Sequence, residues 1–247
     1  MELKDFFNEN KSVALGFSGG VDSSYLFYAA AVGGADVSAY FVKTAFQSEF
    51  ELRYAEKIAQ QIGAEMTVIE LDILADEKIT SNPANRCYYC KQKIFGTIQA
   101  QAIKDGCKLI IDGSNASDDE GDRPGMKAIR ELSVRSPLRE CGLTKADVRE
   151  LSKEAGLFTW DKPAYACLAT RIPTGQIITK DMLVKIELAE DEMFRLGFSD
   201  FRVRVMGDIA KLQVPENQMK SMLNKHAEVL AALKPYFKTV LLDMKGR

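Results

Sequence analysis

The chain has 247 residues, of which 46% are hydrophobic and 28% charged, and its formal net charge is −2 at pH 7. This composition is ordinary for a globular protein, and the near-neutral charge excludes the strong basic field of a general nucleic-acid binder. The sequence lacks an apolar run of about 18 residues and a leader-like start, so we expect a cytoplasmic protein that does not enter a membrane. Its five cysteines, an odd number, favour metal-binding or catalytic thiols over disulfides.

The first predicted element is a short strand, residues 13–17, which runs into Ser18-Gly19-Gly20-Val21-Asp22-Ser23-Ser24 and then into an alanine-rich helix. The glycine pair lets the backbone approach a phosphate closely, and the serines add hydroxyl donors. Unpaired N–H groups in the first turn of the helix lie at the positive end of its dipole. The junction therefore predicts an anion site. Its sequence fits neither a Walker P-loop nor a dinucleotide-binding fingerprint.

Strands and helices alternate over the next hundred residues. This order predicts an α/β fold with a doubly wound parallel sheet, whose βα loops meet at one edge of the sheet. Residues 117–137 are expected to form a loop over that edge with one short helix, and residues 136–138 to add a last strand. The other predicted strands cover residues 36–42, 66–71 and 108–115, and the predicted helices cover 49–62, 91–105 and 144–156.

The pattern changes after residue 160. Residues 160–172 contain Pro163 and are followed by Pro173 and Gly175, which predicts a loop between domains, although residues 164–171 are too apolar for a solvated linker. The elements predicted after this loop are, in order, a long amphipathic helix, a strand with strict alternation, a hairpin partner of that strand, a helix over 216–233 and a last strand. We therefore predict a first domain over residues 1–165 and a small C-terminal α+β domain over residues 166–247.

Three of the cysteines form a candidate site. Cys87 and Cys90 have C-x-x-C spacing at the start of a predicted helix, and Cys167 lies in the loop expected near the same sheet edge. Three thiolates without a fourth match a [4Fe–4S] cluster with one open iron, or a zinc site completed by His226 or water. A pair of packed thiols is the third alternative for Cys87 and Cys90. We expect Cys107 and Cys141 to be structural and His226 to be a surface or packing residue.

The heptad at residues 18–24 resembles the PP-loop, S-G-G-x-D-S, of the N-type ATP pyrophosphatases. The resemblance implies that the protein binds ATP and cleaves it between the α and β phosphates. Asp22 is expected to hold the Mg²⁺ that accompanies the triphosphate. The residues implied in nucleotide binding are Gly16, Phe17, Ser18, Gly19, Gly20, Asp22, Ser23, Ser24 and Gly113.

Four further stretches resemble the LarE family, the ATP-dependent sulfur transferases that make the nickel-pincer nucleotide cofactor of lactate racemase. They are Asn82 to Lys91, Asp112 to Asp119, Gly121 to Gly125 and Cys167 to Pro173. The resemblance spans essentially the whole chain. It implies that a carboxylate of pyridinium-3,5-biscarboxylic acid mononucleotide is adenylylated and then converted by sulfur to a thiocarboxylate.

Individual residues match functional positions of that family. Cys167 matches the sulfur-carrying cysteine and, with Asp22, is the implied catalytic residue. Arg171, Arg202 and Arg204 match basic positions that would face the substrate phosphate, which arginine can hold with two hydrogen bonds. Together with Cys167, the pair Cys87 and Cys90 resembles the three-cysteine subgroup, which implies a [4Fe–4S] cluster that carries the sulfide. The C-terminal domain is then expected to bind the small-molecule substrate and to form a homo-oligomer.

Three other functions compete with this one. A tRNA-thiolating PP-loop enzyme can also hold a three-cysteine cluster, but the sequence lacks a stretch of clustered Lys and Arg with aromatic residues. An ammonia-using PP-loop synthetase would leave the three cysteines without a task. A non-catalytic nucleotide-binding module would bind ATP without releasing AMP.

Overall fold

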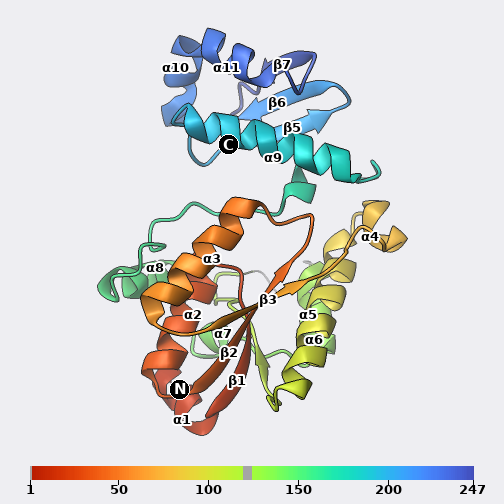
Figure 1. The fold of residues 1–247 in the computed structure, drawn as a ribbon. Helices are drawn as coiled ribbons and strands as arrows, with labels where there is room; N and C mark the ends of the chain where they lie inside the picture. Colours follow the sequence, from red (N-terminus) through yellow and green to blue (C-terminus); the bar gives the residue numbers. More distant parts are fainter. Residues whose placement is uncertain (1, 119–123) are drawn as a thin grey trace. The chain divides into compact units, whose positions relative to one another are not determined.

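The computed structural model describes residues 2–118 and 124–247, which form two compact units (Figure 1). One unit contains the N-terminal residues up to Ile73 and then residues 85–162. The other contains residues 74–84 and 163–247. From the sequence we predicted a single domain boundary after residue 165, and residues 74–84 were not assigned to the second unit. Two backbone hydrogen bonds of 2.8 Å, from Gly175 N to Asn82 O and from Ile178 N to Thr80 O, join that segment to the second unit.

The first unit is built on a four-stranded parallel sheet with the order β3-β2-β1-β4. The strands are β1 (Ser12–Gly16), β2 (Asp36–Lys43), β3 (Met66–Glu70) and β4 (Ile110–Ile111). The predicted parallel α/β fold is confirmed, but β4 is much shorter than the predicted strand. The predicted strand at 136–138 is wrong, because the chain makes one bridge at Arg135 to Ile111 and then forms a short helix that begins at Pro137.

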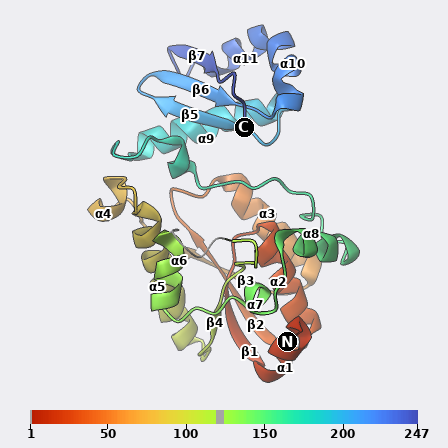
Figure 2. The same ribbon diagram turned by 180° about the vertical axis from the view of Figure 1, so that it is seen from behind.

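Helices cover both faces of this sheet. In β1, Val13 and Leu15 pack with Phe27 on one face, whereas Ala14 packs with Phe95 on the other. Burial on both faces makes the strands nearly continuous apolar runs, which is the pattern of a doubly wound sheet. Figure 2 shows α5 and α6 side by side and α8 next to α2. The helices are α1 (Leu3–Glu9), α2 (Val21–Val32), α3 (Glu49–Ile62), α5 (Arg86–Lys104), α6 (Pro124–Glu131), α7 (Pro137–Glu140) and α8 (Lys145–Glu154).

The second unit has a three-stranded sheet with the order β5-β6-β7, in which β5 and β6 are antiparallel and β6 and β7 are parallel. The small α+β unit is therefore as predicted. The predicted single helix over 216–233 is wrong, because the helix is interrupted at Lys225. The Nζ of Lys225 donates to Leu196 O at 2.7 Å. The elements are α4 (Glu77–Thr80), the 3₁₀ helix η1 (Leu168–Arg171), α9 (Lys180–Arg195), β5 (Arg202–Met206), β6 (Ile209–Gln213), α10 (Glu216–Asn224), α11 (His226–Leu233) and β7 (Thr239–Leu242).

Within residues 2–118 and 124–247, no helix combines the length and apolar character that crossing a bilayer requires.

Candidate functional site

The heptad at residues 18–24 joins the end of β1 to the start of α2. Gly19 adopts a left-handed conformation, with φ of 66°, and its backbone packs closely on Ala55 of α3. Ser18 and Ser23 connect the two ends of the turn, since their hydroxyl oxygens lie 3.0 Å apart. Ser23 Oγ also accepts from Ser18 N at 3.3 Å. The loop is therefore held in one shape by its own side chains, with the first turn of α2 directly behind it.

Gly113, in the loop after β4, lies against the backbone of that first turn. A Cβ atom at this position would lie 2.8 Å from Ser23 N and 3.0 Å from Ser23 Cα. Any larger residue would therefore cover the Ser23 N–H group, which belongs to the helix N-terminus expected to bind an anion. This close approach is an observation that fits a phosphate at the junction.

A cavity of about 540 Å³ opens beside the junction, inside the first unit. One part of its lining, called the polar end below, comes from the turn and the loop after β4, and the other part, the apolar wall, comes from apolar side chains. Cavities of this size and character hold nucleotide-sized ligands. The lining residues at the polar end include Gly16, Phe17, Ser18, Gly20, Asp22, Ser23, Asp112, Gly113 and Asp118, and those of the apolar wall include Phe41, Val42, Ile94, Phe95, Ile98 and Met126.

Most of the predicted nucleotide-binding residues thus line one cavity, but two do not. Gly19 lies behind the turn, where it packs on Ala55. Ser24 is completely buried below the turn. A direct contact of either residue with a nucleotide therefore stays a prediction.

Three lysines to which the sequence analysis gave no role contact the turn or line the cavity. Lys145 Nζ lies 2.5 Å from Asp22 Oδ2. Lys162 Nζ donates to Gly19 O at 3.0 Å and lies 4.5 Å from the centre of the Tyr54 ring. Lys91 lines the cavity itself. Burial lowers the pKa of Lys91, against the opposing effect of Asp112 and Asp118, and burial likewise lowers the pKa of Lys162.

Asp112 is a buried carboxylate at the polar end of the cavity. Its Oδ2 accepts from Ser114 Oγ at 2.6 Å, and its Oδ1 accepts from Ser136 Oγ at 2.6 Å and Ser114 N at 3.2 Å. Buried carboxylates are stable only with such partners. Asp112 therefore fixes the loop that carries Gly113.

The cysteines divide between the two units. Cys87 and Cys90 lie in the first turns of α5, where Cys87 is exposed and lines the cavity. Cys167 belongs to the second unit and is half-buried. Within either unit, the described His, Cys, Asp and Glu side chains form no group of three that could hold a metal ion.

The remaining candidates for metal or thiol chemistry have structural surroundings. Cys107 is buried, with its Sγ 3.5 Å from Ser38 Oγ. Burial raises the pKa of Cys141. His226 is exposed, and its Nδ1 lies 2.9 Å from Leu223 O at the start of α11. These environments agree with the structural and surface roles expected for the three residues.

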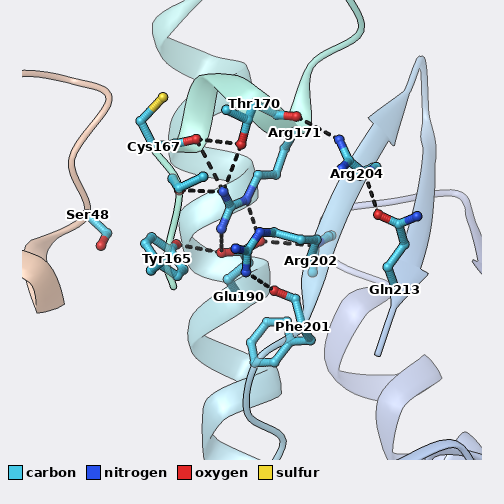
Figure 3. Close-up of polar contacts among 12 residues, drawn as sticks. Ser48, Tyr165, Cys167, Thr170, Arg171, Glu190, Phe201, Arg202, Arg204 and Gln213 are labelled. Atoms are coloured by element: carbon cyan, nitrogen blue, oxygen red, sulfur yellow. Dashed lines mark hydrogen bonds and ion pairs between the residues drawn. The ribbon is translucent and has the colours of Figure 1, made fainter. Parts of the chain in front are cut away.

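The segment around Cys167 is held by a buried ion pair (Figure 3). Arg171 Nε donates to Glu190 Oε1 and Arg171 Nη2 to Glu190 Oε2, both at 2.9 Å, and both side chains are almost completely buried. Arg171 Nη1 donates to the carbonyl oxygens of Ala166 and Cys167 and to Thr170 Oγ1. The Arg171 guanidinium thus connects the backbone carbonyl groups before and after the Cys167 Cα to Glu190 of α9.

The three predicted phosphate ligands are differently placed within the second unit. All three guanidinium nitrogens of Arg171 donate hydrogen bonds to groups of the second unit. The arrangement therefore gives no support to a contact of Arg171 with a substrate phosphate, which stays a prediction. Arg202 is also buried and donates to Phe201 O and Ala164 O, both at 2.7 Å. Burial and then the neighbouring Arg171 lower its pKa to about 10. Arg204 is exposed, and its Nη1 donates to Thr170 O at 2.8 Å.

Two of the stretches that resemble the LarE family extend beyond the residues that the structure describes. Asp119 and the stretch from Gly121 to Arg123 lie outside the described residues. Gly125, at the end of that motif, begins α6 with Pro124 and lines the cavity close to Lys91.

Comparison with known proteins agrees with these motifs. Residues 11–86 match the family model of the queuosine biosynthesis protein QueC. The chain is 35% identical over 249 residues to an uncharacterized protein of Synechocystis sp., and the alignment covers 99% of this chain and 92% of that protein. It is 32% identical over 247 residues to pyridinium-3,5-bisthiocarboxylic acid mononucleotide synthase of Lactiplantibacillus plantarum, with coverage of 99% and 88%.

A more distant similarity covers part of the chain. The tRNA-specific 2-thiouridylase MnmA of Clostridium acetobutylicum is 27% identical over 191 residues, which is 62% of this chain and 54% of that protein. The similarity to the Lactiplantibacillus synthase, by contrast, includes both units. On this evidence, the chain belongs to the LarE family of PP-loop ATP-dependent sulfur transferases.

Proposed function

We propose that the protein adenylylates a carboxylate of pyridinium-3,5-biscarboxylic acid mononucleotide with ATP and converts the product to a thiocarboxylate. The observation that carries this proposal is the cavity at the end of β1. It combines a polar PP-loop end with an apolar wall, in a chain similar over 99% of its length to a synthase of the corresponding bisthiocarboxylic acid.

Membership in the PP-loop family implies that ATP binds with Mg²⁺. The apolar wall suits the adenine ring, and the N–H groups of the first turn of α2 suit the phosphates. Asp22 would hold Mg²⁺, which when bound neutralises part of the triphosphate charge. Gly113 leaves room for a phosphate beside Ser23 N, and Asp112 keeps the Gly113 loop in place.

The proposed reaction has two separable steps. In the first, an oxygen of the substrate carboxylate attacks the α phosphorus, the α–β bridging bond breaks and pyrophosphate leaves. In the second, a sulfur nucleophile attacks the activated carbonyl carbon and AMP leaves with the carboxylate oxygen. Cys167 is the proposed residue of the second step. Its support is the match of residues 167–173 to the family motif and the ion pair that fixes its backbone.

The sulfur of the second step has two candidate sources. We propose that Cys87, Cys90 and Cys167 ligate a [4Fe–4S] cluster, on the support of their spacing and of the position of Cys87 and Cys90 at the start of α5. A cluster with three protein thiolates leaves one iron open, which can hold a sulfide. The alternative is that Cys167 gives up its own sulfur.

The test is a product assay with the purified protein, ATP, Mg²⁺, sulfide and the biscarboxylic acid mononucleotide. We expect AMP and pyrophosphate in equal amounts, together with a product in which one oxygen is replaced by sulfur, detected by mass spectrometry. Asp22→Ala should abolish pyrophosphate release while the far-UV circular dichroism is unchanged. ADP as the nucleotide product would contradict the proposal. Thiolation of tRNA in a parallel assay would assign the chain to the activity named for its more distant relative.

A further inference from the structure

Asp22 and Lys145 form an ion pair at the polar end of the cavity. Lys145 Nζ lies 2.5 Å from Asp22 Oδ2, and Asn115 Nδ2 donates to Asp22 Oδ1 at 3.3 Å. Both carboxylate oxygens therefore have a partner from the first unit. This is the same carboxylate that the proposed function requires for Mg²⁺.

The backbone of Lys145 is fixed next to the PP-loop. Lys145 is the first residue of α8, after the capping residue Thr144. Its N–H donates to Ser117 Oγ at 3.0 Å, and Ala116 N donates to Leu143 O at 2.8 Å. The start of α8 is thus joined to the loop that follows β4, and its first side chain reaches α2.

The stability of the fold does not explain a lysine at this position. A cation in the first turn of α8 lies at the positive end of that helix dipole, which is unfavourable. The side chains of Lys145 and Asp22 keep 35% and 23% of their exposure, and ion pairs with that much contact with water contribute little to stability. The position beside an anion site offers another explanation.

We propose that Lys145 neutralises Asp22 only while the cavity is empty, and that its ammonium moves to the β or γ phosphate when ATP binds. The Asp22 carboxylate that Lys145 leaves would then be available to hold Mg²⁺. A lysine suits this exchange because its ammonium is a point charge on a flexible four-carbon stem. The inference rests on the proposed function, since it takes ATP as the ligand of the cavity.

A double-mutant cycle tests the exchange without any catalytic readout. The affinity for ATP is measured by calorimetry, in EDTA and at fixed ionic strength, for the wild type, Asp22→Asn, Lys145→Met and the double variant. Lys145→Met should weaken the binding of metal-free ATP by at least about tenfold, the effect of losing a hydrogen bond to a charged group. Asp22→Asn should strengthen it, because the ammonium is no longer held by a carboxylate. That gain should be smaller in the Lys145→Met background, where the substitution removes only the repulsion between the carboxylate and the phosphates.

The control is Lys153→Met, the same substitution at the other end of α8, where the ammonium lies over the Trp160 ring. Its affinity for ATP should equal that of the wild type. Thermal unfolding of each variant shows that it is folded, and Lys145→Gln is measured as a second removal of the charge.

Two results would overturn the inference. One is an unchanged affinity in both Lys145 variants. The other is an equal gain from Asp22→Asn in both backgrounds, because that carboxylate would then merely repel the phosphates. A wild type that binds Mg·ATP but shows no coupling refutes only the role of Lys145, whereas a wild type that fails to bind Mg·ATP refutes the proposed function.

Discussion

Arg171 and Glu190 are joined by two parallel hydrogen bonds of 2.9 Å inside the second unit, and almost no part of either side chain contacts solvent. Glu190 Oε1 also accepts from Val203 N at 3.0 Å, and Glu190 Oε2 accepts from the Tyr165 hydroxyl at 2.5 Å. One carboxylate thus connects α9, β5 and the segment that carries Cys167.

Glu190→Ala should lower the free energy of unfolding by about 3–5 kcal/mol, because it leaves the buried Arg171 charge without its partner. Urea denaturation measures the change. The matched control is Glu192→Ala on the same helix, where the ion pair to Arg195 is exposed and should contribute less than about 1 kcal/mol. Equal effects of the two substitutions would show that the buried pair contributes no more than a surface pair.

Gly113→Ala should weaken ATP binding by at least about tenfold, since its Cβ would lie 2.8 Å from Ser23 N and would block one charge-assisted hydrogen bond. Calorimetric titration with Mg·ATP gives the affinity. Gly96→Ala is the control, because a Cβ there meets no atom within 4 Å. An unaffected Gly113→Ala variant would place the phosphates elsewhere.

Cys167→Ala should separate the two proposed steps. Activation of the carboxylate does not use the thiol, so exchange of labelled pyrophosphate into ATP should continue in the presence of substrate while no thiocarboxylate forms. Loss of both activities in a folded variant would contradict this division.

The cluster proposal predicts brown protein after anaerobic purification, with about four irons per chain. Serine substitution of Cys87, Cys90 or Cys167 should each remove the colour, whereas Cys141→Ser should keep it. Absorption spectra and iron analysis decide the outcome. A colourless protein with one zinc would favour the zinc alternative, and colour that persists in the Cys167 variant would exclude that residue as a ligand.

Lys91→Met should stabilise the protein at pH 7, because burial lowers the pKa of Lys91 in the folded state. The unfolded chain then holds the proton more tightly, so the stability of the wild type should rise with pH until it passes the ordinary lysine pKa. The advantage of Lys91→Met should shrink over the same range. Lys93→Met, an exposed position on α5, is the control for urea denaturation at several pH values.

The order of strands and helices could be predicted because burial leaves a periodic pattern in the sequence. Val13, Ala14 and Leu15 are apolar in succession because β1 is covered on both faces. Residues 74–84 could not be assigned, since hydrogen bonds to residues more than ninety positions away decide their unit. The place of Arg171 was equally unpredictable, because arginine is rarely buried and its partner Glu190 is nineteen residues away.

The site was predictable where chemistry depends on a local motif. Most of residues 18–24 line one cavity together with Gly113, and the rest belong to the same turn. They lie together because the strand ends of a parallel sheet meet at one edge. Lys145 and Lys162 were missed because nothing in their neighbouring residues distinguishes them from surface lysines, and Lys91, at the end of a quoted motif, was given no role. Only the fold brings them to the turn.

The shortness of β4 has a consequence for hydrogen exchange. With only Ile110 and Ile111 in the ladder, the Ser114 amide lies beyond the sheet and donates to Asp112 Oδ1 at 3.2 Å, and Asp112 is held in turn by the hydroxyl groups of Ser114 and Ser136. The rate at which the Ser114 amide exchanges with deuterium should therefore report on a single carboxylate. Asp112→Asn should accelerate that exchange at the nucleotide site and leave the protection of β1 and β2 at its wild-type level.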